Sequence, residues 1–94
     1  MRGRNRVIKK DLVIKNQIGL HARPAAMFVQ RANRYEADIF VEKNTKNVNG
    51  KSIMGIMSLG VAKNESITII IDGPDELEAM DDLTNLIEKV LLEY

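Results

Sequence analysis

The stretch IGLHARPAAMFVQRA, from Ile18 to Ala32, marks the point where the spacing of apolar residues changes from that of a strand to that of a helix. Within it, apolar residues recur three and four positions apart, which is the period of one helical face. Pro24 fits only near the start of such a helix, because a proline there loses no backbone hydrogen bond. We therefore predict a helix that begins close to Ala22. Its apolar face consists of Ala25, Phe28, Val29 and Ala32.

The segment before this helix, VIKKDLVIK at residues 7–15, alternates between apolar and polar residues. Ile8, Leu12 and Ile14 share one parity, whereas charged residues hold most of the other. A two-residue period is typical of a half-buried strand. A break at residues 16–19 separates this strand from the helix.

The segment after the helix, ADIFVEKNTKNVNG at residues 37–50, predicts a hairpin with its turn at Asn44 and Thr45. Thr45 resists the positive φ that a two-residue type I′ turn requires, so we expect another turn type or local strain. ESITIIID at residues 65–72 alternates again and predicts a further strand. The inward positions of these strands are Ala37, Ile39, Val41, Val48, Ile67, Ile69 and Ile71.

Two more helices are expected. KSIMGIMSLG at residues 51–60 predicts a short helix with Ser52 as its N-cap and Leu59-Gly60 at its end. GPDELEAMDDLTNLIEKVLLEY at residues 73–94 has acidic residues in its first turn, where the helix dipole favours them. The apolar face of this closing helix is predicted to contain Leu77, Met80, Leu83, Ile87, Val90 and Leu91.

The predicted order is therefore βαββαβα, which places the chain in the α+β class. Since each strand has one apolar face and each helix one apolar stripe, the economical packing is an open-faced β-sandwich. It combines a four-stranded antiparallel sheet with three helices on one face. Val13, Phe40 and Ile70 would lie on the open face, where ordinary exposed apolar area is a commoner explanation than a contact surface.

Composition excludes several classes of protein. With 94 residues the chain is long enough for one domain, and 14 Lys and Arg against 13 Asp and Glu do not suggest a nucleic-acid binder. The absence of cysteine removes disulfides and thiolate metal sites. No apolar run is long enough to span a bilayer, and no apolar secretion segment begins the chain. We expect a soluble, cytoplasmic protein without membrane insertion.

Residues 1–6, MRGRNR, carry arginine at every second position. They could form an arm for nucleic acid or an anionic surface, but a solvated terminus is the commoner explanation. We therefore predict a flexible basic extension at residues 1–6 and a folded domain at residues 7–94.

His21, the only histidine, falls at or beside the N-cap of the first helix. The first backbone N–H groups of a helix lack partners within it, and together with the dipole they attract anions. A ring nitrogen beside such a site can take up a phosphoryl group. Arg23 adds a cation suited to phosphate oxygens, and Gly19 allows a close backbone approach that positions the ring.

On residue types alone, a single histidine more often caps a helix or lies on the surface than performs chemistry. Metal binding is a poorer hypothesis, because one imidazole without cysteine leaves too few of the usual ligands. We expect no metal and no cofactor.

The segment GLHARPAAMFVQRA resembles the active-site signature of HPr, the histidine-containing phosphocarrier of the bacterial phosphoenolpyruvate-dependent sugar phosphotransferase system. KSIMGIMSLGVA is similar to the regulatory serine segment of the same family in its Gram-positive form. The likeness runs from about Val7 to the C-terminus and implies the same βαββαβα order.

The resemblance implies that the protein is a phosphoryl carrier rather than an enzyme. His21 would accept the phosphoryl group on Nδ1 from enzyme I and pass it to the IIA components of sugar permeases. Arg23 matches the active-site arginine, while Gly19, Ala22 and Pro24 would position the phosphate.

Ser52 matches the serine that HPr kinase/phosphorylase modifies, which implies slower transfer through His21 and corepression with a CcpA-type regulator in carbon catabolite repression. Crh, the relative without the phosphorylatable histidine, is disfavoured because His21 is present. Ile56 and Leu59 are expected in the core. The implied docking surface consists of Met27, Gln30, Ile53, Met54 and Met57, since methionine adapts to several partners.

Three departures from the family pattern stand out. Ile18 occupies a position where members often have a small polar residue, Thr45 replaces a glycine at the hairpin tip, and the N-terminal extension is long.

Two other classes of function stay open. A regulatory paralogue would act mainly through Ser52 and a transcription regulator. An RNA-binding α/β sandwich would use the open sheet, but Phe40 is the only aromatic residue expected there. We expect a monomer that binds no nucleic acid.

Overall fold

The structure, a computed structural model, describes residues 7–94, so the extension predicted at residues 1–6 lies outside the described residues. The elements follow the predicted βαββαβα order, with an added 3-10 turn at the end. They are β1 (Ile8–Val13), α1 (Ala22–Ala32), β2 (Asp38–Lys43), β3 (Lys46–Asn49), α2 (Ile53–Ser58), β4 (Ser66–Asp72), α3 (Glu76–Glu88) and η1 (Val90–Glu93).

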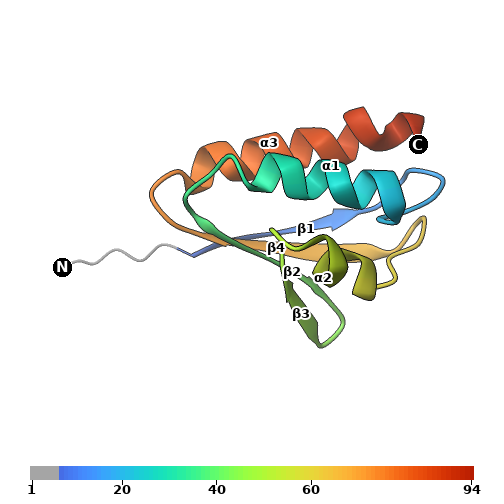
Figure 1. Cartoon of the computed structure of the whole chain (residues 1–94), viewed down its shortest axis with the longest axis horizontal. Helices are drawn as coiled ribbons and strands as arrows, with labels where there is room; N and C mark the ends of the chain where they lie inside the picture. The colour runs from blue at the N-terminus through green and yellow to red at the C-terminus, as the bar shows by residue number, and fades with distance from the viewer. Residues whose placement is uncertain (1–6) are drawn as a thin grey trace.

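The sheet is antiparallel throughout, in the order β1-β4-β2-β3. Phe40 of β2 lies between Ile70 of β4 and Asn49 of β3, and Ile70 in turn pairs with Lys9 of β1. Figure 1 shows α1 and α3 side by side along the sheet, with α2 near β2 and β3. This is the predicted α+β fold with one helix layer.

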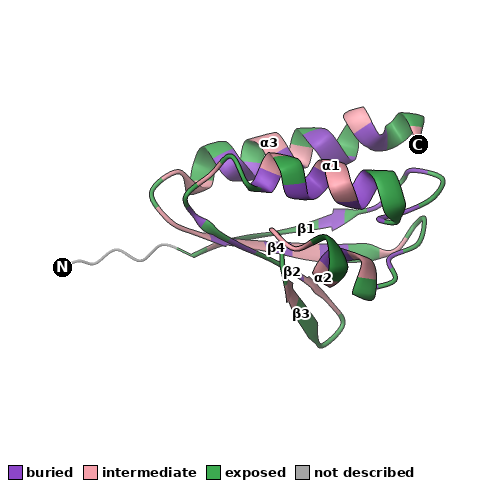
Figure 2. Ribbon diagram, in the orientation of Figure 1, coloured by how far each residue is buried: buried purple, intermediate pink, exposed green. Residues whose placement is uncertain are grey.

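Burial alternates along the strands as the sequence predicts. The inward residues Leu12, Ile39, Val41, Ile67, Ile69 and Ile71 are buried. On the other face Val13 and Phe40 are each 38% exposed, which confirms that this face is uncovered. In Figure 2 the buried positions of α1 and α3 lie on the sides that face the sheet.

The closing helix differs from its prediction at Leu77, which is 73% exposed rather than buried. At 3.6 residues per turn, Leu77 lies about 120° around the helix from Leu83, the centre of the buried stripe. Ala79 and Leu86 fill that stripe instead. The helix also ends at Glu88 rather than near Tyr94, and residues Val90–Glu93 form the 3-10 turn η1 instead.

The hairpin turn is not a type I′ turn, which would require a positive φ at Thr45. Asn44 adopts a φ of 57°, whereas Thr45 stays outside the left-handed region. Asparagine tolerates this region better than a β-branched residue does. The expected departure from type I′ is therefore confirmed.

Across residues 7–94, none of the helices has the length and apolar character needed to cross a membrane.

Candidate functional site

His21 occupies the N-cap position of α1 with its side chain exposed. Its backbone is extended, with φ −119° and ψ 155°, and its imidazole makes no capping hydrogen bond. The ring therefore does not cap the helix, and its exposure fits both a surface histidine and a reactive one. It stands at the helix end, accessible to another molecule.

The first turn of α1 supports an anion next to this ring. Residues 22–25 include no acidic side chain, so no carboxylate of this turn competes for its backbone N–H groups. Pro24 lies in this turn, as predicted, and it is buried. Ala22 has a φ of 41°, and a non-glycine residue in the left-handed region carries a strain of roughly 1–3 kcal/mol. Such strain persists only where surrounding contacts enforce it.

Gly19 lies where the chain has no space for a side chain. Its φ is 65°, and a Cβ atom there would lie 2.2 Å from the carbonyl oxygen of Val61. The neighbouring Leu20 N–H donates to that same oxygen at 3.0 Å. The close approach predicted for Gly19 is thus present, and its partner is the backbone of Val61.

Asn16 is a residue that sequence reasoning missed. It is only 1% exposed, and its Nδ2 donates to the Gly19 carbonyl oxygen at 2.8 Å. Its Oδ1 has no hydrogen-bond partner among the described residues. An asparagine three residues before a glycine, at the break after a strand, was the available signal. It helps to hold the loop that leads to His21.

Arg23 is exposed and forms no salt bridge within residues 7–94. Together with Ala26, Met27 and Gln30 it lines a shallow depression on α1. The structure thus brings the predicted phosphate-binding arginine next to two predicted docking residues.

Ser52 is the N-cap of α2, as predicted. Its Oγ accepts a hydrogen bond from the Gly55 N–H at 3.0 Å. A Cβ atom on Gly55 would lie 3.3 Å from this Oγ, so a larger residue at position 55 would crowd the Ser52 hydroxyl group. The Ser52 side chain is half-buried.

The predicted docking surface is only partly exposed. Met54 is 79% exposed and Ile53 43%, and Gln30 is also exposed. Met57 and Met27, however, are half-buried and pack against the core, so they are less exposed than the docking surface implied by the resemblance. Part of each of these two methionine side chains therefore contacts buried residues of the core.

The two predicted core residues of α2 behave as expected. Ile56 is fully buried and Leu59 is 6% exposed. Since α2 also contacts α1, the residues of the predicted docking surface come from two helices that touch.

Within residues 7–94 there is no group of three or more His, Cys, Asp and Glu side chains that could hold a metal ion.

Known proteins match this chain along most of its length. The family model described as "PTS HPr component phosphorylation site" matches residues 8–89. The "HPr-like protein Crh" of Halalkalibacterium halodurans is 52% identical over 83 residues, which are 88% of this chain and 99% of that protein.

Solved structures agree with the sequence match. The structure of "HPr-C-His" from Thermoanaerobacter tengcongensis has a TM-score of 0.87 and 48% identity, and the match covers 93% of this chain and 97% of that one. A phosphocarrier protein HPr from Bacillus anthracis has a TM-score of 0.84 and 49% identity, with 87% and 98% covered. Relatives named HPr and a relative named Crh are thus similar to about the same degree. On these matches and on its fold, the chain belongs to the HPr family of phosphocarrier proteins.

Proposed function

We propose that this protein carries phosphoryl groups in the phosphoenolpyruvate-dependent sugar phosphotransferase system. His21 accepts the group from phospho-enzyme I and passes it to sugar-specific IIA proteins. In each step a phosphorus–nitrogen bond forms or breaks at Nδ1 of His21, while the bond to the donor or acceptor protein does the reverse. The observation that supports this function most directly is the exposed imidazole at the start of α1, which makes no capping hydrogen bond.

The residues around His21 have complementary roles in this proposal. Backbone N–H groups of the first turn receive the phosphate oxygens, and Arg23 adds a charge-assisted hydrogen bond. Gly19, Ala22 and Pro24 position the backbone at the start of α1. The carrier acts in the cytoplasm as a monomer and needs no cofactor.

The proposal predicts that phosphoenolpyruvate and enzyme I label the protein with an acid-labile phosphoryl group. His21→Ala should abolish the label while circular dichroism stays unchanged, since the exposed ring supports no part of the core. Arg23→Ala should retain the label but form it about tenfold more slowly, because one charge-assisted contact is lost. Arg34→Ala, at an exposed arginine beyond the end of α1, is the matched control. Normal labelling of the His21→Ala protein would refute the carrier function.

A second function is supported by Ser52 and by the similarity to Crh. In this alternative the protein is a regulatory paralogue, which HPr kinase/phosphorylase modifies at Ser52 and which then binds a CcpA-type regulator. Ser52 lies next to Ile53 and Met54, which are exposed and available to such a partner. Efficient labelling at Ser52, combined with poor transfer from enzyme I to His21, would favour this function over the first.

A further inference from the structure

The segment between α2 and β4, residues 59–65, contacts two regions that are distant from it in the sequence. One is residues 16–20, and the other is Lys43 at the end of β2. We refer to residues 59–65 as the α2–β4 loop and to residues 16–20 as the His21 loop, because the latter leads directly to His21. The α2–β4 loop follows the helix that starts at Ser52.

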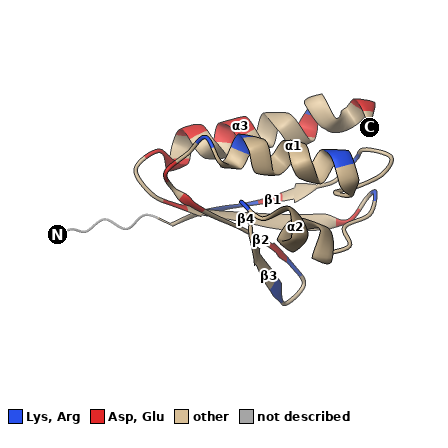
Figure 3. Cartoon of the chain, viewed as in Figure 1, with Lys and Arg blue, Asp and Glu red and all other residues tan. Residues whose placement is uncertain are grey.

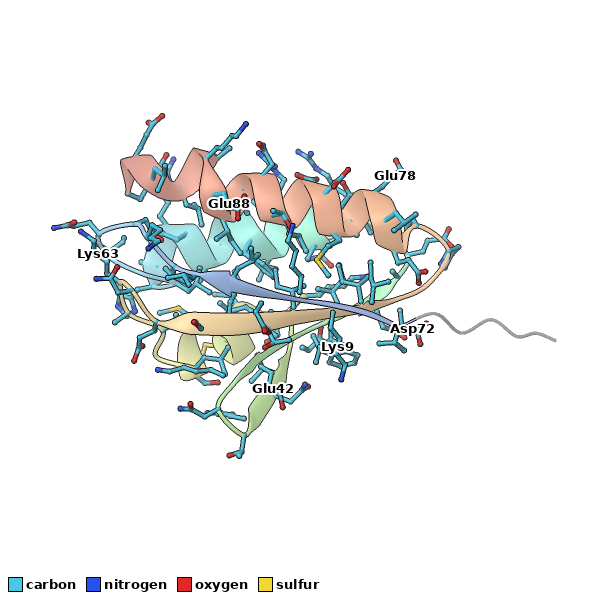
Figure 4. The ribbon with its side chains drawn as sticks, turned by 180° about the vertical axis from the view of Figure 1, so that it is seen from behind. Lys9, Glu42, Lys63, Asp72, Glu78 and Glu88 are labelled. Atoms are coloured by element: carbon cyan, nitrogen blue, oxygen red, sulfur yellow. The ribbon has the colours of Figure 1, made fainter. Side chains whose placement is uncertain are left out.

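Several contacts join the α2–β4 loop to the His21 loop. The Leu20 N–H donates to the Val61 carbonyl oxygen at 3.0 Å, and Gly19 packs against the same carbonyl group. The Lys63 Nζ donates to Gln17 Oε1 at 3.2 Å. Figure 4 shows Lys63 at the end of the molecule where these loops meet. The position of the His21 loop thus depends on where the α2–β4 loop lies.

The end of β1 is joined to the same loop. The Ile14 N–H donates to the Glu65 carbonyl oxygen at 2.9 Å, and the Asn64 N–H donates to the Ile14 carbonyl oxygen at 2.6 Å. These backbone bonds hold the start of the His21 loop in register with the end of the α2–β4 loop.

One lysine holds the α2–β4 loop to the sheet. The Lys43 Nζ donates to Glu65 Oε1 at 2.8 Å, to the Gly60 carbonyl oxygen at 3.1 Å and to the Leu59 carbonyl oxygen at 3.4 Å. Glu65 Oε1 also accepts the Ala62 N–H at 2.8 Å. The Lys43 side chain is 18% exposed and that of Glu65 43%. The pair therefore ties both ends of the loop together.

The charge state of Glu65 agrees with this geometry. The hydrogen bond from Lys43, followed by that from the Ala62 backbone, lowers the pKa of Glu65 below its usual value. The carboxylate is therefore ionised at neutral pH and keeps Lys43 paired.

We propose that Lys43 and Glu65 are positioning residues for phosphoryl transfer at His21. They fix the α2–β4 loop, and Val61 of that loop fixes Leu20 next to His21. The inference rests on the proposed carrier function for its kinetic consequence, but the structural link between Lys43 and Leu20 can be tested without it. A displacement of a reacting group by about 1 Å can lower a rate by about a hundredfold, so even a small shift of this support would be measurable.

Lys43→Met is the test variant, because it keeps the aliphatic stem and removes the three donated contacts. Lys46→Met is the matched control, since Lys46 also donates to a carbonyl oxygen near the end of α2, that of Ser58 at 3.1 Å, and is not among the partners of the α2–β4 loop. Lys43→Arg restores the charge and the donors. Amide hydrogen exchange of Leu20 and the rate of phosphoryl transfer from enzyme I are measured on each protein, well below its melting temperature.

We expect Lys43→Met to increase the exchange rate of the Leu20 amide and to lower the transfer rate about tenfold, while Lys43→Arg restores much of both. Lys46→Met should resemble the parent in both measurements.

Unchanged Leu20 exchange in Lys43→Met, an equal effect of Lys46→Met, or faster exchange with an unchanged transfer rate would overturn the inference. Failure of the parent protein to accept phosphate would instead refute the proposed function, and the exchange measurement would still decide whether Lys43 supports Leu20. If Lys43→Met does not fold, Glu65→Gln is used in its place, since its amide oxygen can still accept the Ala62 N–H.

Discussion

At the scale of single residues, the loop before His21 is held by close contacts at Gly19 and Asn16. Gly19 meets the Val61 carbonyl group, and the buried Asn16 amide holds the Gly19 carbonyl group. Ala22 adopts a left-handed φ that alanine ordinarily avoids. Together these contacts indicate that the backbone around His21 is held in one strained conformation, which is typical of functional sites.

Gly19→Ala tests whether the close approach to Val61 matters beyond the backbone conformation itself. The matched control is Gly60→Ala, because Gly60 has a similar φ of 61° but no atom within 4 Å of an added Cβ. Gly60→Ala should lower the free energy of unfolding by about 1–2 kcal/mol through the left-handed φ alone. Gly19→Ala should cost more, since the backbone must also move away from a carbonyl oxygen at 2.2 Å.

Urea unfolding measures both values on the same scale. Equal losses of stability in the Gly19→Ala and Gly60→Ala proteins would show that the contact with Val61 contributes nothing.

At the scale of elements, α2 is a helix of 6 residues whose start depends on one side chain. So short a helix is not stable by its own hydrogen bonds, and it relies on packing through Ile56 and on the cap at Ser52. Aspartate can also cap a helix, and a negative charge at a helix N-terminus is favoured by the dipole. A phosphate on Ser52 would therefore act mainly on partners rather than on the fold.

Ser52→Asp should accordingly weaken binding to enzyme I while the melting temperature stays the same or rises slightly. The charge would lie beside Ile53 and Met54, where a partner would have to desolvate it. Ser52→Ala should retain binding but lower the free energy of unfolding by about 1 kcal/mol, because the bond to the Gly55 N–H is lost.

Titration with enzyme I and thermal melting measure the two effects. Ser58→Asp, at the other end of α2, is the control for charge position and should lower the melting temperature, since the dipole disfavours an anion there. Tight binding of enzyme I by Ser52→Asp, or a melting temperature several degrees lower, would contradict the proposed effect of Ser52.

At the scale of the whole molecule, α1 and α3 are joined by a polar network on the helical layer. Figure 3 shows acidic residues along α3. One of them, Asp82, accepts hydrogen bonds from Arg31 at the end of α1 and from the Tyr35 hydroxyl at 2.5 Å. The hydrogen bond to Asp82, followed by burial, raises the pKa of Tyr35 to about 12.

This network predicts a pH dependence at the alkaline end. The ordinary tyrosine pKa is 10.0, and the folded protein binds the proton more tightly because only the neutral hydroxyl can donate to Asp82. Its contribution to stability is therefore fully present below pH 10 and is lost as the pH rises through about 12. Ultraviolet titration of tyrosine should show an ionisation near pH 12 that Tyr35→Phe removes. Asp82→Asn should move that ionisation toward lower pH, and an unchanged midpoint would exclude Asp82 as its cause.

Much of the fold could be predicted from local patterns in the sequence. The two-residue period of apolar residues predicted the strands, and apolar residues three and four positions apart predicted α1. Ser52, as an N-cap, predicted the start of α2. These features depend on residues that are neighbours in the chain, so the sequence contains all the information they require. The place of His21 and Pro24 at the start of one helix was predictable for the same reason, whereas the chemistry expected of His21 came from the resemblance to HPr.

The parts that could not be predicted depend on residues that meet only after folding. Lys43 and Glu65 are 22 positions apart, and no period links them. The rotation of α3 that exposes Leu77, the half-burial of Met57 and the contact of Gly19 with Val61 are likewise set by how the helices and loops pack against the sheet. The sequence by itself thus determined the four strands and three helices, their order, and the residues that begin α1 and α2. Only the tertiary structure decided what supports His21, because the partners of its loop, Val61 and Lys63, lie on the α2–β4 loop, which is distant in the chain and is itself held by Lys43 of β2.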